Sequence, residues 1–310
     1  MKGLVMKSTG SRYLVKADGK IFDCSLKGKL RLQDRKSTNP VAVGDHVELE
    51  ISADGEPVLS EIYPRSNYII RRSINLSKQV HILASNLDQA LLLISLIFPR
   101  TSLGFIDRFL VTAEAYRIPA ILVFNKLDLL NEDLRSIQKE YIDIYTKAGY
   151  ACYEINSLDA NSVSVLKNLL KDKTTLVAGH SGAGKSTFIN SLQPGLDLKT
   201  GELSQAHNKG VHTTTFAELH ELDFGGYIID SPGIKELGLV DMKKEEVGHY
   251  FPEIRALMQQ CKFNNCLHVN EPKCAVIEAV QNDQVSPERY RSYLNILNGD
   301  EMDWKEWETR

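Results

Sequence analysis

Short runs of alternating hydrophobic and polar residues occupy about the first 65 residues of the chain. Turn signals such as Asp18-Gly19 and Asp54-Gly55 separate these runs. The expected strands are residues 3–6, 12–16, 20–25, 45–51 and 57–62. Five short strands predict a small β-barrel, with the OB-fold as the leading candidate. The alternative is a generic barrel that only packs against its neighbour.

From about Leu87 the pattern changes to apolar strands that alternate with amphipathic helices. We expect strands at 90–96, 121–124, 151–155 and 174–178, helices through 105–113, 134–144 and around 166–170, and a hairpin joining 216–222 to 227–229. Such α/β alternation predicts a mostly parallel sheet that binds ligand at the carboxyl ends of its strands. After about Val240 only helical segments remain, so the expected domains are 1–66, 67–240 and 241–310.

Charge and composition refine this organisation. The 310-residue chain has a formal net charge of -3, which excludes a uniformly basic nucleic-acid binder. Its first 40 residues, however, hold ten basic and three acidic residues, a local balance of +7 that favours contact with a phosphate backbone. The start has no signal-like apolar core, and the best apolar run, 90–98, is far below the roughly 20 residues of a membrane span. We therefore expect a cytoplasmic protein without a membrane partner.

A phosphate-binding loop follows the strand at 174–178 and matches G-x-x-x-x-G-K-S in full. Its residues are Gly179, His180, Ser181, Gly182, Ala183, Gly184, Lys185 and Ser186, with Thr187 next in the chain. The backbone N–H groups of such a loop surround phosphate oxygens, Lys185 neutralises the β and γ oxygens, and Ser186 supplies a hydroxyl to Mg²⁺. Lys185 is therefore a catalytic candidate as well as a ligand.

A guanine-reading tetrapeptide, Asn125, Lys126, Leu127 and Asp128, ends the strand at 121–124. The Asp128 carboxylate can accept hydrogen bonds from two guanine donors together, Asn125 would engage the base edge, and Lys126 would pack along the base. These residues predict GTP rather than ATP. Ser157 occupies the position of the loop that covers the base in other G domains.

The third motif, D-x-x-G, runs from Asp230 to Gly233. Asp230 would hold Mg²⁺ through water, the Gly233 N–H would contact the γ-phosphate, and Thr214 would complete the Mg²⁺ shell. Ile234 stands where many GTPases place a glutamine that orients water, so His212 is the catalytic candidate, with an ordinary surface histidine as the alternative. Because the guanine reader precedes the phosphate loop, the sequence predicts a circularly permuted G domain.

A cluster of soft ligands lies in the C-terminal segment: Cys261, Cys266, His268 and Cys274. Three thiolates and an imidazole are the ligand set of a tetrahedral structural Zn²⁺ site, and four protein ligands leave no open coordination position. Cys24 and Cys152, isolated in strand-like runs, are expected to be core residues.

Together these motifs resemble those of the RsgA family, bacterial GTPases of small-ribosomal-subunit biogenesis. The resemblance covers nearly the whole chain and is carried by the motif order combined with the cysteine–histidine cluster. The family's Gly-x-His-Thr-Thr-Thr form appears at 210–215, which places its proposed catalytic histidine at His212. The resemblance implies an OB-fold, a circularly permuted G domain and a zinc domain. It also implies rRNA binding, action in late subunit maturation, GTP hydrolysis stimulated by the small subunit, and release after hydrolysis.

Two other functional classes remain as alternatives. A P-loop kinase or synthetase acting on a metabolite shares the phosphate loop but does not need the guanine tetrapeptide or the D-x-x-G motif. A nucleic-acid-binding module with a purely structural G domain would require a broken site, whereas Lys185, Ser186 and Asp230 are all present. We expect a monomer that binds GTP or GDP with Mg²⁺, one structural Zn²⁺ and no DNA.

Overall fold

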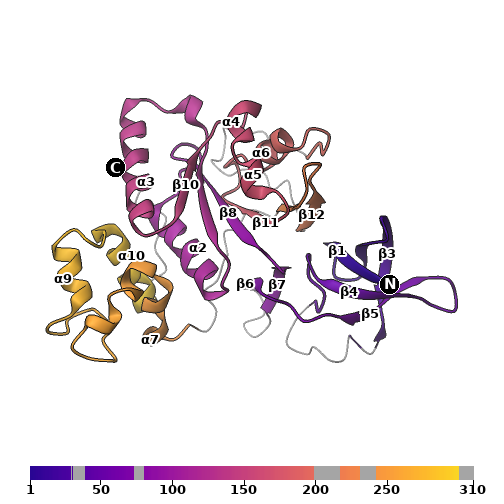
Figure 1. Ribbon diagram of the computed structural model, residues 1–310, viewed down its shortest axis with the longest axis horizontal. Coiled ribbons are helices and arrows are strands. Elements are labelled where there is room, and N and C mark those ends of the chain that lie inside the picture. The colour runs from indigo at the N-terminus through magenta and orange to yellow at the C-terminus, as the bar shows by residue number, and fades with distance from the viewer. Residues whose placement is uncertain (29, 31–38, 73–79, 199–216, 231–241, 300–310) are drawn as a thin grey trace.

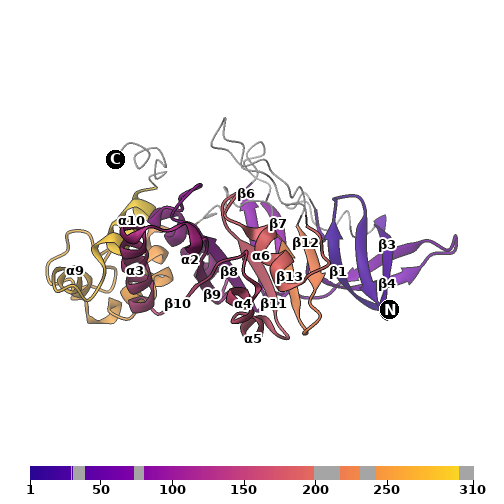
Figure 2. The same cartoon turned by 90° about the horizontal axis from the view of Figure 1, so that it is seen from above.

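The computed structural model describes residues 1–28, 30, 39–72, 80–198, 217–230 and 242–299. These residues form a β-barrel at one end, an α/β region in the middle and a group of short helices at the other end (Figures 1 and 2). Within the described residues, no helix combines the length and the hydropathy that a membrane span requires.

The N-terminal barrel consists of the five strands that the sequence predicts. They are β1 (Lys2–Ser8), β2 (Tyr13–Ala17), β3 (Lys20–Leu26), β4 (His46–Ile51) and β5 (Pro57–Ile62). The strand order is β1-β2-β3-β5-β4, and pairing of β1 with β4 closes the barrel. Alternate residues such as Val5, Val15 and Leu49 point into its core, as does Cys24. The expected OB-like barrel is confirmed.

An antiparallel ribbon that the sequence analysis did not predict follows the barrel. It pairs β6 (Tyr68–Arg72) with β7 (Val80–Ser85). The barrel is joined to this ribbon by the buried Asp45 carboxylate, which accepts hydrogen bonds from Ser85 Oγ at 2.6 Å and from Arg65 Nε at 2.6 Å. This joint fixes the barrel against the start of the α/β region.

Six strands of the described residues form the central sheet. They are β8 (Gln89–Ile94), β9 (Ala120–Phe124), β10 (Ala151–Glu154), β11 (Thr174–Ala178), β12 (Glu218–Glu221) and β13 (Tyr227–Asp230). Their order is β10-β9-β8-β11-β13-β12, and every pair is parallel except β12 with β13. The expected parallel sheet with a terminal hairpin is therefore confirmed.

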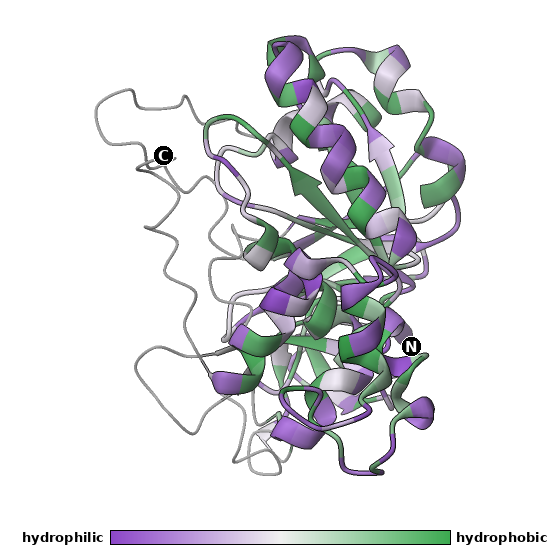
Figure 3. Ribbon diagram, turned by 90° about the vertical axis from the view of Figure 1, so that its left-hand side faces the viewer, coloured by the Kyte–Doolittle hydropathy of each residue, from purple (hydrophilic) through white to green (hydrophobic). Residues whose placement is uncertain are grey.

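Helices cover both faces of this sheet, as the alternating pattern predicts. They are α2 (Leu103–Ala115), α3 (Glu132–Lys147), α4 (Ala160–Ser164), α5 (Lys167–Leu170) and α6 (Lys185–Leu192). Leu92 of β8 packs in one cluster with Phe109 of α2, whereas Leu91 packs in another with Phe188 of α6. A strand buried on both faces must be hydrophobic throughout, and Figure 3 shows hydrophobic strands beside helices of mixed hydropathy.

The sheet continues into the barrel, so the two form one eleven-stranded sheet. The link is an antiparallel pairing of β1 with β12, in which Lys7 lies opposite Glu218. Lys7 Nζ donates to Glu218 Oε2 at 2.7 Å, and Lys16 forms a second ion pair with Glu221. The barrel is thus attached to the strand that forms a hairpin with β13.

The C-terminal segment is helical, as expected. Its helices are α7 (Lys244–Val247), α8 (Pro252–Arg255), α9 (Ala275–Gln281) and α10 (Pro287–Asn298), with 3₁₀ turns at Gly248–Tyr250 and Met258–Gln260. Ser286 caps α10 by accepting from Arg289 N, and Gly299 ends it in the left-handed conformation. Phe251, Ile254 and Tyr293 form its core together with Val111 of α2. The segment therefore packs on the α2 side of the central sheet.

Candidate nucleotide and metal sites

The phosphate loop connects the end of β11 to the start of α6, the context that the motif requires. Gly179, Gly182 and Gly184 have positive φ angles of 145°, 84° and 99°. A Cβ at Gly179 would lie 2.7 Å from the Leu93 carbonyl oxygen. Glycine is required here because the loop turns sharply against β8. The loop has the local form of an anion-binding turn at a helix N-terminus.

Lys185 lies under this loop with its ammonium turned back onto it. Nζ donates to the Gly179 and His180 carbonyl oxygens, both at 3.0 Å. Burial lowers the pKa of Lys185, and the nearby Asp230 carboxylate opposes that shift. Asp230 itself is buried and ends β13, where the parallel register places it beside Val177 of β11. Lys185 and Asp230 thus come together at the carboxyl edge of the sheet.

The guanine tetrapeptide is joined to the phosphate loop by the side chain of Asn125. Its Nδ2 donates to the Ala183 carbonyl oxygen at 2.9 Å, and its Oδ1 accepts from Ser157 N at 3.0 Å and from Ser157 Oγ at 2.8 Å. Asn125 is only 2% exposed. Contact of Asn125 with the base edge stays a prediction, and its amide also holds three loops together. Gly184 has no room for a side chain here, because its Cβ would lie 2.5 Å from Asn125 Nδ2.

The rest of the tetrapeptide is more open. Lys126 has a φ of 68° and donates from Nζ to the Phe98 carbonyl oxygen at 2.6 Å, and burial lowers its pKa. Leu127 and Asp128 begin a 3₁₀ turn, and the Asp128 side chain is exposed. An exposed carboxylate beside a tethered lysine leaves room for a base to approach Asp128. The contact of Lys126 with Phe98 has no signal in the sequence.

The other loop residues are partly buried: His180, Ser181, Ser186 and Thr187. His180 stacks on Phe105 of α2, with ring centroids 3.9 Å apart and an interplanar angle of 30°. The sequence assigns Phe105 to the core face of a helix and gives no sign of this contact. Thr214, Gly233 and His212 lie outside the described residues, as does Ile234.

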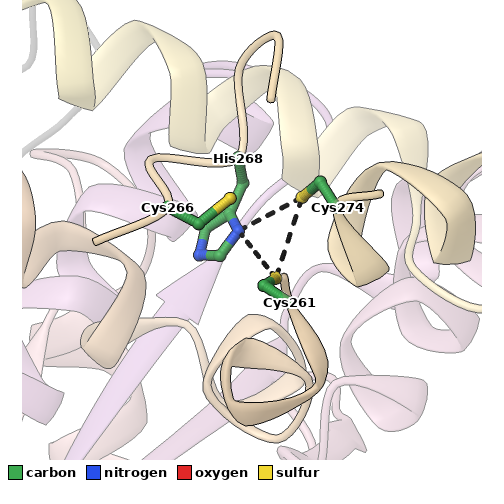
Figure 4. Close-up of side chains that lie close together, drawn as sticks. All are labelled: Cys261, Cys266, His268 and Cys274. Atoms are coloured by element: carbon green, nitrogen blue, oxygen red, sulfur yellow. Dashed lines mark hydrogen bonds between the residues drawn. The ribbon is translucent and has the colours of Figure 1, made fainter. Parts of the chain in front are cut away.

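The four predicted metal ligands come together in the C-terminal segment (Figure 4). One ligand atom from each of Cys261, Cys266, His268 and Cys274 lies within 4.8 Å of all the others. Cys261 Sγ is 3.9 Å from Cys274 Sγ, and His268 Nδ1 is 3.5 and 3.3 Å from these two sulfurs. Two sulfurs bound at 2.3 Å to a tetrahedral ion would be about 3.8 Å apart. The spacing of Cys261, His268 and Cys274 therefore fits Zn²⁺, with Cys266 close enough to be the fourth ligand.

The surroundings of the cluster hold its ligands in this arrangement. The hydroxyl groups of Tyr290 and Tyr293 donate to the carbonyl oxygens of His268 and Leu267, at 2.5 and 2.6 Å. Glu271 accepts from the backbone N–H groups of Leu267, Val269 and Asn270. Burial lowers the pKa of His268, which favours the neutral imidazole that can bind a metal.

Burial also raises the pKa of the Cys266 thiol to about 12.

The other two cysteines lie elsewhere in the chain. Cys24 is fully buried in the barrel core, and Cys152 is partly buried in β10. These two cysteines therefore lie in packed strands, as expected, and apart from the four-residue cluster.

Comparison with known proteins places these observations in a family. The family model of the RsgA GTPase matches residues 62–240, and that of the RsgA N-terminal domain matches residues 2–59. The chain is 53% identical over 302 residues to small ribosomal subunit biogenesis GTPase RsgA 2 of Bacteroides thetaiotaomicron, covering 97% of each protein. It is 51% identical over 309 residues to the RsgA of Flavobacterium psychrophilum, covering 98% of this chain and 95% of that one.

Solved structures show the same similarity. The crystal structure of YjeQ from Thermotoga maritima matches with a TM-score of 0.78 and 34% identity, covering 96% of this chain and 98% of that one. YloQ, described as a circularly permuted GTPase, matches with a TM-score of 0.73 and 31% identity, covering 96% of this chain and 94% of that one. With its barrel, permuted α/β region and Cys₃His cluster, the chain belongs to the RsgA GTPase family.

Proposed function

We propose that this protein hydrolyses GTP as an assembly factor that binds the small ribosomal subunit during its late maturation and leaves after hydrolysis. The observation that carries this proposal is the hydrogen bond from Asn125 to Ala183, which fixes the guanine tetrapeptide against the phosphate loop. The names of the relatives above supply the ribosomal role. Membership in the RsgA GTPase family argues against the alternative function of a metabolite kinase.

The residues of the phosphate loop and the start of α6 have proposed roles that their positions support. Backbone N–H groups from Gly179 to Lys185 would surround the β-phosphate, as at other helix N-termini. On nucleotide binding, the Lys185 ammonium would exchange its two carbonyl contacts for phosphate oxygens. Ser186 and Thr187 open α6 beside the loop, and Ser186 with Asp230 would hold Mg²⁺.

Guanine recognition would rest on Asp128. Its exposed carboxylate can accept from both donors of the guanine edge, a pattern that adenine does not present. Lys126, tethered to the Phe98 carbonyl, would support the base, and Leu127 links the tetrapeptide to Ile155 through its backbone N–H. Ser157 would cover the base from the neighbouring loop.

Hydrolysis needs a residue that positions the attacking water. Ile234 has no polar group for this task, so His212 is proposed for it, with Thr214 on Mg²⁺ and Gly233 on the γ-phosphate. We propose that the small subunit stimulates turnover and that this stimulation acts through His212. Basal turnover of the isolated protein would then be slow.

The barrel and the C-terminal helices lie at opposite ends of the central region, which suits a grip on rRNA from two sides (Figure 2). The balance of +7 in residues 1–40 would favour phosphate contacts in the barrel. A structural Zn²⁺ would hold the C-terminal end in shape. We propose domains at 1–66, 67–240 and 241–310, a monomeric state, a cytoplasmic location and no DNA partner.

Sedimentation with purified subunits tests this proposal. The protein should pellet with small subunits in the presence of a non-hydrolysable GTP analogue and be released when GDP replaces the analogue. Large subunits under the same conditions are the control and should retain little protein. Equal retention by both subunits, or by small subunits in both nucleotide states, would contradict the proposal.

A further inference from the structure

Helix α2 contacts the phosphate loop at its first turn. Ser102 caps the helix by accepting from Phe105 N at 3.2 Å, which fixes where the helix begins. The Phe105 ring then stacks on the His180 imidazole at a centroid distance of 3.9 Å. An aromatic pair at this distance restricts the position of both rings. The second residue of the phosphate loop therefore rests on α2.

Two residues further along, α2 is fastened to the C-terminal segment by a buried ion pair. Arg289 Nη1 of α10 donates to Asp107 Oδ1 at 2.7 Å, and each residue is 1% exposed. The same carboxylate oxygen accepts from the Tyr145 hydroxyl at 2.8 Å. On its other side, Arg289 donates to both oxygens of Glu253, and its guanidinium lies 4.6 Å from the Phe251 ring centre. This guanidinium therefore has a fixed position and no contact with bulk water.

A second pair joins the same two parts but has a different character. Arg255 Nη1 lies 3.0 Å from Glu114 Oε2 near the far end of α2, and the Arg255 side chain is 49% exposed. Exposed ion pairs contribute little to stability. Removing one partner of a buried ion pair costs much more, because it leaves an uncompensated charge in the interior. Of these two ion pairs, the buried Arg289 pair is therefore the one that can hold α2 in position.

We propose that Phe105 is a positioning residue for the phosphate loop, and that Arg289 holds α2 in the place where Phe105 can act. The docked C-terminal segment then raises the affinity for guanine nucleotide through α2. By thermodynamic reciprocity, bound nucleotide must stabilise the docking of α10 on α2 to the same extent. This inference rests on the nucleotide site proposed above.

The release rate of fluorescent GDP tests the role of Phe105. Phe105→Leu should speed release about two- to tenfold, the range that corresponds to loss of an aromatic pair. Phe109→Leu is the matched control. Phe109 is a buried residue of the same helix that packs in the hydrophobic core, so this variant should lose stability but release GDP at the parental rate. Parental release from Phe105→Leu, or equal acceleration in both variants, would overturn the positioning role.

Arg289→Met and Arg255→Met form the second matched pair. Arg289→Met should accelerate GDP release, and adding Phe105→Leu to it should give less than the product of the two effects, because both act through α2. Arg255→Met should release GDP at the parental rate. Independent effects of Phe105 and Arg289 would contradict the connection through α2.

Hydrogen exchange of the unmodified protein gives a test that does not depend on the folding of any variant. GDP should slow exchange of backbone amides both in the phosphate loop and in α10 (residues 287–298). Protection of the loop without any change in α10 would refute this inference while leaving the nucleotide site standing. A phosphate loop that GDP does not protect would refute the nucleotide site as well.

Discussion

Replacing Gly184 by alanine should break the connection between the phosphate loop and the guanine tetrapeptide. Gly184 has a φ of 99°, and its added Cβ would lie 2.5 Å from Asn125 Nδ2, far inside normal contact distance. Gly195 provides the matched control, because its φ is 105° and an added Cβ would meet nothing within 4 Å. Both variants carry the strain of a left-handed alanine, and only Gly184→Ala displaces Asn125.

The expected losses of stability follow from two costs: the strain of a left-handed alanine and the displacement of Asn125. A left-handed conformation costs a residue with a Cβ about 1 to 2 kcal/mol, which is the whole loss of unfolding free energy expected for Gly195→Ala. Gly184→Ala should lose about 1 to 3 kcal/mol more, because the displaced amide leaves buried groups of Ala183 and Ser157 without their hydrogen bonds.

Urea unfolding measures the loss of stability in the two variants, and titration with fluorescent GDP measures their affinity. Gly184→Ala should bind GDP at least tenfold more weakly than the parent, and Gly195→Ala should bind it equally well. If the two variants were equally stable and bound GDP equally well, the bridging role of Asn125 would be wrong.

Three further predictions test separate parts of the site. Asp128→Asn should lower GTP affinity at least tenfold, since a charge-assisted hydrogen bond contributes about 1.5 to 3 kcal/mol, and should improve binding of xanthosine triphosphate; unchanged GTP affinity would remove Asp128 from base recognition. Metal analysis should find about one Zn²⁺ per parent chain. Cys266→Ser should lose this ion and the order of the C-terminal helices while still binding GTP, whereas a metal-free parent with ordered helices would contradict the zinc site. His212→Ala should abolish turnover stimulated by small subunits with little change in nucleotide affinity, and retained stimulation would exclude the histidine.

Much of the fold could be predicted because local pattern and tertiary position agree. Strands β5 (Pro57–Ile62) and β11 (Thr174–Ala178) have the bounds that the sequence predicts. The meeting of Asn125 with the phosphate loop could also be anticipated in outline, because the carboxyl ends of parallel strands share one edge of a sheet. The metal ligands are close in sequence, so their spacing alone indicated the cluster.

The contacts that the sequence did not reveal join residues far apart along the chain. The ribbon of β6 and β7 depends on pairing across an intervening segment and on an isolated parallel bridge between Val43 and Ala84. From the sequence, Arg289 is a charged residue in the first turn of a helix. In the structure it is buried and forms ion pairs with Asp107 and Glu253. Periodicity reports which face of an element is apolar, but it does not report which distant charge will be enclosed with it.

The hydrogen bonds of Asn125 to Ala183 and Ser157 were not predicted for a different reason. Its motif predicts the neighbourhood of the base, but hydrogen bonding by the buried amide is decided by the nearest unsatisfied groups, the Ala183 carbonyl and the Ser157 N–H. Glycine at position 184 is the one sequence feature consistent with this close approach. A glycine in the phosphate motif, however, is explained equally well by the phosphate itself.

The most direct test of the whole account is phosphate release from GTP by the intact protein, alone, with purified small ribosomal subunits, and with large subunits. A GTPase of small-subunit assembly should turn over GTP slowly by itself, much faster with small subunits, and no faster with large ones. Turnover that small subunits leave unchanged, or that both subunits raise equally, would contradict the account.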